Sequence, residues 1–335
     1  YPERRYYYSN EIIPAEGPIT VIRNGIQVEI NPEPSFCREL LQENIERTFH
    51  RLNDEVLSKN PDVSVDYSVT VDITKEEMDS LSEKSKTFGC TPSYNLYDTR
   101  ADVGVKDASK YFSRSAGGHI HIGGHKNAGE SSVSVEFLQN PARIIPVLDL
   151  IVGNTCVLVD RDPGNKKRRE TYGRAGEYRL PKHGIEYRTL SNFWLRDYAL
   201  MSMVFGLVRQ AILIVWKSNE EHDYAKELMS MVNIDDVRNA INNNDRELAL
   251  KNFNKIKDFM IEIGRSHRDT PDVLSHTTME DFEYFISKPI EHWFPSTDIV
   301  GAWLKDYSDD DCYGIESFLS NVVHLERTGR IADYW

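Results

Sequence analysis

The sequence is poor in cysteine and has no long uninterrupted run of hydrophobic residues. The four cysteines lie far apart and form no Cys-x-x-Cys pair: Cys37, Cys90, Cys156 and Cys312. This spacing favours free thiols in a reducing compartment over a disulfide framework. The longest apolar run, residues 201–216, is interrupted by Arg209 and Gln210. Because a membrane-spanning helix needs about 20 mostly apolar residues, we expect a soluble, cytoplasmic protein without a membrane partner.

The chain also lacks an excess of positive charge and a glycine-rich phosphate loop. Its 40 Lys and Arg residues stand against 53 Asp and Glu residues, which gives a formal net charge of −13. A protein this acidic has no general attraction for nucleic acid, so we expect no nucleic-acid partner. Neither GxxxxGKS/T nor GxGxxG occurs. Any nucleotide phosphates would therefore have to be bound by metal ions and by Arg and Lys side chains.

The pattern of apolar residues predicts an α+β fold. Apolar residues recur at helical spacing in these segments, the first of them preceded by Ser35 as a candidate N-cap: 36–57, 141–160, 192–217, 235–263, 279–285 and 315–325. Alternating or turn-punctuated segments predict strands: 12–30, 63–73, 117–123 and 171–190. We predict a single catalytic domain over residues 1–335. An antiparallel sheet backed by helices would occupy residues 1–215, and residues 216–335 would be helical.

Two histidines lie between pairs of glycines in the segment Arg114-Ser-Ala-Gly-Gly-His-Ile-His-Ile-Gly-Gly124. On a strand, His119 and His121 would point to one face while Ile120 and Ile122 point to the other. The glycines would let a ligand approach the backbone closely. A pair of surface histidines on a sheet is the alternative interpretation of this pattern.

A second segment that alternates polar and apolar residues is Gly184-Ile-Glu-Tyr-Arg-Thr-Leu-Ser-Asn192. Glu186 and Arg188 would share one strand face, either as a simple salt pair or as a metal-binding carboxylate beside a phosphate-binding guanidinium. Gln27-Val-Glu-Ile-Asn31 places Glu29 on the polar side of another strand. Two carboxylates and an imidazole are ligands suited to Mg²⁺ or Mn²⁺. We therefore predict three strands that line one polar cleft.

Basic residues gather in the stretch that precedes this second segment. The residues predicted to bind nucleotide phosphates are Lys167, Arg168, Arg169, Arg174, Arg179 and Arg188. A solvated basic loop is the alternative interpretation. It fits Lys166 and Lys167 better than it fits Arg174 and Arg179, which fall in the more organised segment Tyr172-Gly-Arg-Ala-Gly-Glu-Tyr-Arg179.

These segments resemble the phage-type carboxylate–amine ligases, the type 2 amidoligases of the glutamate–cysteine ligase and glutamine synthetase superfamily. The resemblance rests on RSAGGHIHIGG, YGRAGEYR, GIEYRTLSNFWL, VEINPEP from Val28 onward, and Phe88-Gly-Cys-Thr-Pro-Ser-Tyr-Asn95, and it covers roughly residues 11–215. It implies a glutamine-synthetase-like antiparallel sheet with a concave active-site face. It also implies an ATP- and Mg²⁺-dependent enzyme that joins a carboxylate to an amine through an acylphosphate, in the host cytoplasm if a phage encodes it.

The resemblance further implies roles for individual residues. The implied metal ligands are Glu3, Glu29, His119 and Glu186, with His121 as an alternative to His119. Glu3 follows Pro2 as in the family, but Arg4 and Arg5 replace the apolar residues that the family carries there. The implied catalytic residues are Arg188 and Arg179, which would stabilise the phosphoryl group in transfer, and His121.

Other functions stay open at this point. His119, His121 and His125 could hold zinc in a hydrolase. A non-catalytic phage protein could keep the fold and its cleft, and a guanidino kinase of related fold is a more distant alternative. The implied substrates are ATP and a carboxylate and amine pair, drawn from amino acids, peptides or protein side chains. The sequence does not identify them, nor does it give the oligomeric state.

Overall fold

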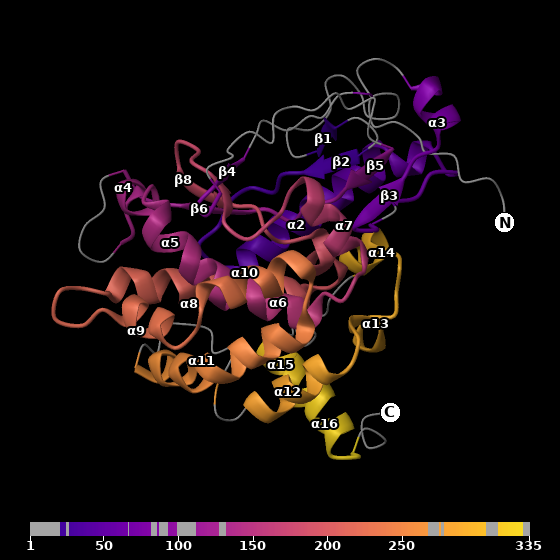
Figure 1. Cartoon of the computed structure of the whole chain (residues 1–335). Helices are drawn as coiled ribbons and strands as arrows, with labels where there is room; N and C mark the ends of the chain where they lie inside the picture. The colour runs from indigo at the N-terminus through magenta and orange to yellow at the C-terminus, as the bar shows by residue number, and fades with distance from the viewer. Residues whose placement is uncertain are drawn as a thin grey trace. The chain divides into compact units, whose positions relative to one another are not determined.

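A computed structural model of the chain (Figure 1) describes residues 21–24, 27–65, 67–81, 86, 93–98, 112–126, 132–266, 275, 278–305 and 314–330. The chain forms two compact units. The first comprises Tyr1–Pro92, Asp102–Ala116 and Ser296–Asp306, and the second comprises Ser93–Ala101, Gly117–Pro295 and Tyr307–Trp335. The helices and small antiparallel sheets confirm the predicted α+β class.

The first unit combines short strands with one long helix. Its described elements are β1 (Val21–Asn24), β2 (Gln27–Ile30), α2 (Arg38–Glu55), a 3₁₀ turn (Leu57–Lys59), β3 (Thr70–Asp72), α3 (Lys75–Ser80), β5 (Ser113–Ser115) and α14 (Ile299–Trp303). β1 pairs antiparallel with β2, and β3 with β5. Phe49 of α2 stacks on Trp303 of α14 with ring centroids 5.7 Å apart, so the helix is held by a buried aromatic pair.

Two predicted elements of this unit differ from the observed ones. α2 begins at Arg38, with Cys37 rather than Ser35 at the N-cap. The Ser35 hydroxyl instead accepts a hydrogen bond from the Cys37 amide at 3.1 Å, which turns the chain into the helix. The strand predicted over 63–73 shortens to Thr70–Asp72, the part of this segment that pairs with β5 among its described residues.

The second unit contains, among its described residues, a four-stranded antiparallel sheet in the order β4 (Tyr94–Asn95), β7 (Glu177–Arg179), β8 (Gly184–Tyr187), β6 (Ile120–Gly123). The strand predicted over 117–123 begins later than expected, and the segment 171–190 contains two of these strands. β2, which carries Glu29, pairs with β1 and does not enter this sheet within the part of the chain that the structure describes. The predicted sheet of three polar strands is therefore reduced to the strands of His121 and Glu186.

Helices make up most of the second unit. They are α4 (Val135–Leu138), α5 (Pro141–Leu148), α6 (Asn154–Val159), α7 (Gly164–Thr171), α8 (Tyr198–Lys217), α9 (Tyr224–Ser230), α10 (Ile234–Asn243), α11 (Arg246–Ser266), α12 (Met279–Ser287), α13 (Ile290–Trp293), α15 (Ile315–Phe318) and α16 (His324–Arg327). Ile185 and Tyr187 of β8 share one hydrophobic cluster with Phe282 of α12 and Leu319 beyond α15. The C-terminal helices therefore pack into the same core as the sheet.

Local chemistry explains where the helices depart from prediction. The helix predicted over 235–263 breaks at Asn244, which adopts the left-handed conformation (φ 52°) and caps α10. The helix predicted over 192–217 begins as a 3₁₀ turn, Asn192–Arg196, before Asp197 caps α8 by accepting from the Ala199 amide. α7 was not predicted, because its polar sequence carries no apolar period.

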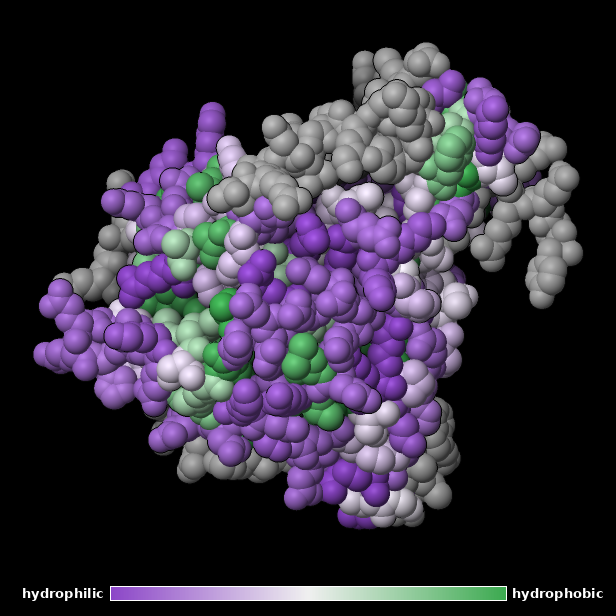
Figure 2. Space-filling view, in the orientation of Figure 1, coloured by the Kyte–Doolittle hydropathy of each residue, from purple (hydrophilic) through white to green (hydrophobic). Residues whose placement is uncertain are grey.

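The two most apolar helical segments are core helices of the second unit. Pro141–Val159 and Tyr198–Lys217 are long and apolar enough to cross a membrane by length and composition, and Arg209 and Gln210 do not prevent this. In the most apolar 18-residue stretch of each segment, 83% and 78% of the residues respectively are buried inside the protein. Such burial is what core helices show, so the composition is weak evidence for a membrane span. In Figure 2 the visible face of this unit is mostly hydrophilic, with apolar side chains gathered near α5 and α8.

A buried carboxylate lies behind β8. Asp149 opens a π-helical turn (Asp149–Gly153) that continues α5 into α6, three residues after Pro146. It accepts hydrogen bonds from the hydroxyls of Tyr187 at 2.8 Å and Tyr97 at 2.9 Å. Burial raises the pKa of Asp149 to about 7, against the partial opposition of these two hydrogen bonds. Tyr187 is the neighbour of Glu186, so this cluster anchors the strand from the core side.

The raised pKa of Asp149 predicts a pH-dependent stability. The folded state retains the proton to about pH 7 while the unfolded chain loses it near the ordinary value of 3.8. Protonated Asp149 therefore contributes at most about 4 kcal/mol to the free energy of unfolding. This contribution is complete below about pH 4, and it is lost as the pH rises through 7. Asp149→Asn should flatten this part of the profile, measured by urea unfolding at pH 5 and pH 8. Asp258→Asn, at an exposed position of α11, should not. An unchanged slope in Asp149→Asn would contradict the assignment.

Candidate active site

The polar face of the four-stranded sheet brings one carboxylate together with four basic side chains. Strand register places His121 of β6 and Arg179 of β7 directly opposite Glu186 of β8, one on each side. The next row along the strands holds Arg188, two residues after Glu186, and His119, two residues before His121. Because side chains alternate across a strand, all five residues share one face.

Distances show that Glu186 is the centre of this cluster. The Arg188 Nη1 donates to Glu186 Oε1 at 2.7 Å, and His119 Nδ1 lies 3.2 Å from the same oxygen. Arg179 Nη1 lies 3.7 Å from Oε2, and His121 Nε2 lies 3.9 Å from Oε1. Arg188 and Glu186 are almost completely buried, whereas His121 is exposed at the rim. One buried carboxylate therefore organises two guanidinium and two imidazole groups.

The sequence folds this way because apolar and polar residues alternate on both β6 and β8. Ile120 is paired with Tyr187 and Ile122 with Ile185, and these four side chains pack against the hydrophobic core. The predicted alternation is thus confirmed. At the end of the pair, Gly184 adopts φ 153° and a side chain there would collide with the Ile122 carbonyl, so glycine is required for the close approach of the strands.

Burial and charge set the protonation of the cluster. Burial alone would raise the pKa of Glu186, but the hydrogen bond from His119 and the charge of Arg188 outweigh it and lower the pKa to about 2. Burial lowers the pKa of His119 to about 4, and the charge of Arg188 adds to this effect, so His119 is neutral at pH 7. Burial also lowers the pKa of His121.

The hydrogen-bond partner assigns the tautomer of His119. A carboxylate can only accept, so the proton sits on Nδ1 and points at Glu186. Nε2 then carries a free lone pair, and this buried atom has no hydrogen-bond partner among the described residues. It lies beside Gly117 and the Tyr172 hydroxyl, since a side chain at Gly117 would collide with both. The site therefore presents an unused acceptor, suited to a hydrogen-bond donor or a metal ion.

A buried glutamate shapes the loop next to the cluster. Glu177 of β7 accepts hydrogen bonds from the amides of Gly173 at 2.9 Å and Arg174 at 3.1 Å. Its own carbonyl accepts from the Arg188 amide at 3.1 Å. Because both carboxylate oxygens accept from backbone N–H groups, Glu177 fixes the loop 173–176.

The basic stretch does not act as one group. Arg168 and Arg169 of α7 are buried, whereas Lys167 and Arg174 are exposed. Arg168 donates to the carbonyls of Arg188, Thr189 and Leu190, and Arg169 donates to the Asn244 side chain at 2.9 Å. These two arginines have structural partners, which differs from the phosphate contacts predicted for them. For Lys167 and Arg174 a phosphate contact stays a prediction.

The remaining predicted metal ligands lie elsewhere in the chain. Glu29 is exposed on β2 in the first unit, where the Asn31 amide group donates to it at 3.5 Å. Glu3 falls outside the described residues. The described residues contain no group of three or more His, Cys, Asp or Glu side chains that could hold a metal ion. His119, His121 and His125 therefore form no zinc triad.

The donor set restricts what kind of metal site could form here. Glu186 is the carboxylate at the centre of the described cluster, and the orphaned Nε2 of His119 points away from it, because the Nδ1 of the same ring faces Glu186. Mg²⁺ bound with a nucleotide needs only one or two protein carboxylates, because phosphate oxygens and water complete its shell. The cluster fits such a magnesium ion and does not fit an all-protein cage.

His183 was missed by sequence reasoning. It lies in the turn between β7 and β8, and its Nε2 is 3.2 Å from the Nδ1 of His121. The two rings are exposed at the rim of the cluster, with their centroids 5.3 Å apart. The signal was weak, since Lys182-His183-Gly184 has the composition of an ordinary turn.

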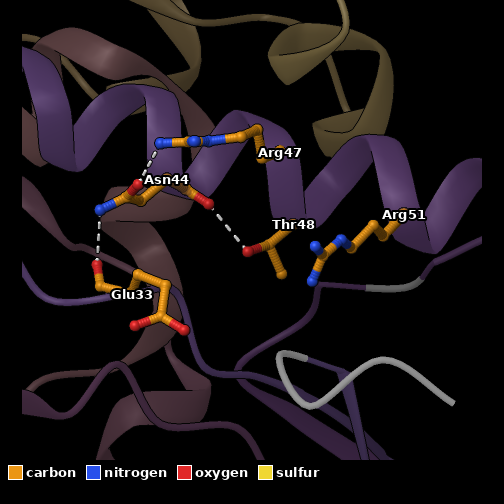
Figure 3. Close-up of a pocket in the computed structure, with 5 residues that line it drawn as sticks. All are labelled: Glu33, Asn44, Arg47, Thr48 and Arg51. Atoms are coloured by element: carbon orange, nitrogen blue, oxygen red, sulfur yellow. Dashed lines mark hydrogen bonds between the residues drawn. The ribbon is translucent and has the colours of Figure 1, made fainter.

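The first unit has a separate polar pocket of about 110 Å³ (Figure 3). Its lining residues are Glu33, Asn44, Arg47, Thr48 and Arg51. The buried Asn44 side chain donates to the Glu33 carbonyl at 2.8 Å and accepts from Arg47, while the Thr48 hydroxyl donates to the Asn44 carbonyl. These internal bonds join α2 to the segment after β2.

The comparison with protein families decides where this chain belongs. A family model described as phage phiEco32-like COOH.NH2 ligase-type 2 matches residues 99–279. This range covers more than half of the chain and includes the whole Glu186 cluster. The chain belongs to this family. The match extends beyond residue 215, and it leaves out VEINPEP. No curated protein and no solved structure matches the chain.

The Glu186 cluster predicts a large cost for removing its carboxylate. Glu186→Gln leaves Arg188 buried without its counter-charge, and breaking a buried ion pair on one side typically costs about 3–5 kcal/mol. Glu291→Gln is the matched control, because Glu291 pairs with Arg196 at 3.0 Å but is exposed, and it should cost at most about 1 kcal/mol. Urea unfolding at pH 7 measures both. Equal costs would contradict a buried ion-pair centre.

The lowered pKa of Glu186 also gives a sign for acid unfolding. The charged form is favoured in the folded state, so its contribution to the free energy of unfolding is present above the ordinary value of 4.5 and is lost as the pH falls towards 2. Glu186→Gln should therefore weaken the acid dependence between pH 4.5 and 2 relative to the wild type. Thermal unfolding at several acid pH values measures this difference.

Proposed function

We propose that this protein is an ATP-dependent carboxylate–amine ligase that forms an amide bond through an acylphosphate. The observation that carries the proposal is membership of the COOH.NH2 ligase-type 2 family, whose name gives a carboxylate and an amine as the joined groups. The matched range includes His119, Glu186 and Arg188. A concave, glutamine-synthetase-like active-site face and the cytoplasm as compartment belong to the same proposal.

The chemistry of the cluster supports phosphoryl transfer. A substrate carboxylate oxygen attacks the γ-phosphorus of ATP, the bond to the bridging oxygen breaks, and ADP leaves. An amine nitrogen then attacks the acyl carbon and phosphate leaves with the bonding electrons, while the proton of the amine passes to a base. Arg188 and Arg179, which both face Glu186, would stabilise negative charge on the transferred phosphoryl oxygens.

Individual residues of the cluster would divide the remaining tasks. Glu186 would hold the magnesium ion that arrives with the nucleotide, and this ion would neutralise phosphate charge, while the Nδ1 of His119 would keep Glu186 oriented. Glu186 keeps Arg188 oriented before substrate binds, through the bond at 2.7 Å. His121, at the exposed rim, is the candidate to accept the proton of the amine.

The alternatives gain no support from the described residues. A zinc hydrolase would need three converging ligands, and the described part of the chain has no such group. A non-catalytic relative could keep the buried pair of Arg188 and Glu186 for stability alone, so the pair does not separate it from the ligase. Turnover of nucleotide separates the ligase from both.

The direct test is product analysis by mass spectrometry. The protein is incubated with ATP, Mg²⁺ and mixtures of candidate carboxylates and amines drawn from amino acids and peptides. The ligase should produce ADP, phosphate and a condensed product in equal amounts. Oxygen-18 in the substrate carboxylate should appear in the released phosphate, because the acylphosphate passes one oxygen to it. Condensation without transfer of this label would contradict the acylphosphate, and hydrolysis without condensation would contradict the ligase.

Arg188 gives the sharpest mutational prediction. Arg188→Ala removes a charge-assisted donor from a buried site, and loss of one such preorganised donor typically lowers kcat by about 10²–10³-fold. Nucleotide affinity should fall less than kcat, since the contact matters most as charge develops. Arg188→Lys should rescue poorly, because a point charge cannot replace a planar fork of donors. ATP turnover and nucleotide binding measured side by side decide this. Turnover that survives in Arg188→Ala would remove the residue from the mechanism.

A further inference from the structure

Arg168 makes an unusual set of contacts for a residue of a basic stretch. Its side chain is fully buried on α7. Nη1 donates to the Thr189 carbonyl at 2.8 Å, and Nη2 donates to the carbonyls of Leu190 at 2.7 Å and Arg188 at 3.2 Å. Three consecutive carbonyls after β8 therefore converge on one guanidinium. Both terminal nitrogens donate to the backbone, and the remaining donor, Nε, has no hydrogen-bond partner among the described residues but is buried with the rest of the side chain, so Arg168 is not presented to a phosphate at the surface.

The far side of the guanidinium is closed by the loop after α7. The Arg168 guanidinium lies over the Tyr172 ring at 4.5 Å from its centroid. Gly173 follows with φ 80°, and any side chain there would collide with the Arg168 guanidinium. The Tyr172 ring in turn meets the edge of His119, with centroids 5.8 Å apart. Arg168 is thus held between the segment 188–190 and the loop that touches His119.

The same carbonyls connect the two rows of the candidate active site. The Leu190 carbonyl accepts a hydrogen bond from Arg168 and another, at 3.0 Å, from the amide of Gly118. Gly118 is the residue before His119. The Arg188 carbonyl accepts from Arg168, while the Arg188 side chain binds Glu186. The buried Arg168 side chain therefore fixes the backbone segments that carry His119 and Arg188.

We infer that Arg168 is a positioning residue that fixes Arg188 and His119 relative to each other, and that it does not bind nucleotide phosphate. This inference rests on the proposed ligase function for its kinetic consequence, but its structural part stands on the contacts alone. Lysine cannot replace Arg168, because a single ammonium on a flexible stem cannot span three carbonyls as a planar guanidinium does. Displacement of reacting groups by about 1 Å can cost about 10²-fold in rate.

The first test compares Arg168→Lys with Arg143→Lys. Arg143 of α5 is a matched control, since it also donates to backbone carbonyls, those of Val215 at 3.3 Å and Ser218 at 2.8 Å, away from the cluster. Both variants should unfold at lower temperature. Arg168→Lys should also lower kcat about 10²-fold with little change in the KM for ATP, whereas Arg143→Lys should leave both constants unchanged.

A second pair of variants probes the same contact from the loop side. Gly173→Ala places a methyl group against the Arg168 guanidinium, whereas Gly329→Ala carries a similar backbone strain at φ 72° with nothing within 4 Å of the added carbon. Gly173→Ala should reproduce the loss of kcat, and Gly329→Ala should not. Equal kinetics in the two glycine variants would overturn the inference.

A readout independent of activity separates this inference from the proposed function. Amide hydrogen exchange should become faster at Gly118 and Arg188 in Arg168→Lys but not in Arg143→Lys, because the carbonyls and strands that hold these amides lose their anchor. Unchanged exchange, or a raised KM for ATP with kcat retained, would overturn the positioning role. If the wild-type protein turns over no nucleotide, the ligase function fails, and the exchange result still decides whether Arg168 holds this segment.

Discussion

The ion pair between Glu186 and Arg188 is the interaction on which the rest of the candidate site depends. Both side chains are almost fully buried, and an unpaired charge at that depth would be costly. The pair is tolerated because His119 and Arg179 also face the carboxylate and because the Arg188 backbone is bonded to Glu177 and Arg168. The strand β8 is also held from its core side, because the Tyr187 hydroxyl donates a hydrogen bond to Asp149.

Strand periodicity made the central part of this arrangement predictable. The alternation in His119-Ile-His121 and in Glu186-Tyr-Arg188 assigns the polar face of each strand without further information. The strand register places His121 and Arg179 on the two sides of Glu186. This register joins β8 to β6, which lies about 60 positions earlier in the chain, and to β7 across a turn. Such pairings follow from tertiary packing, and a periodic pattern does not contain them.

The basic stretch shows why composition alone misled. Lys167 and Arg168 are neighbours of the same charge, yet one is exposed and the other is fully buried against backbone carbonyls. Helix α7 turns successive side chains to different sides, and its sequence has no apolar residues that would mark the buried side. The break at Asn244 was hidden for a related reason, because the apolar period continues on both sides of a single left-handed residue.

The charge balance of the cluster bears on how it would receive a substrate. The chain as a whole carries a formal charge of −13, but the described cluster gathers Arg179 and Arg188 around a single carboxylate. A local positive excess on an acidic protein attracts anions to that place. Arg188 uses one nitrogen for Glu186, and its planar fork leaves further donors for an incoming phosphate oxygen. Glu186 would then keep the guanidinium oriented throughout, so that binding of the anion need not break the ion pair that holds the site together.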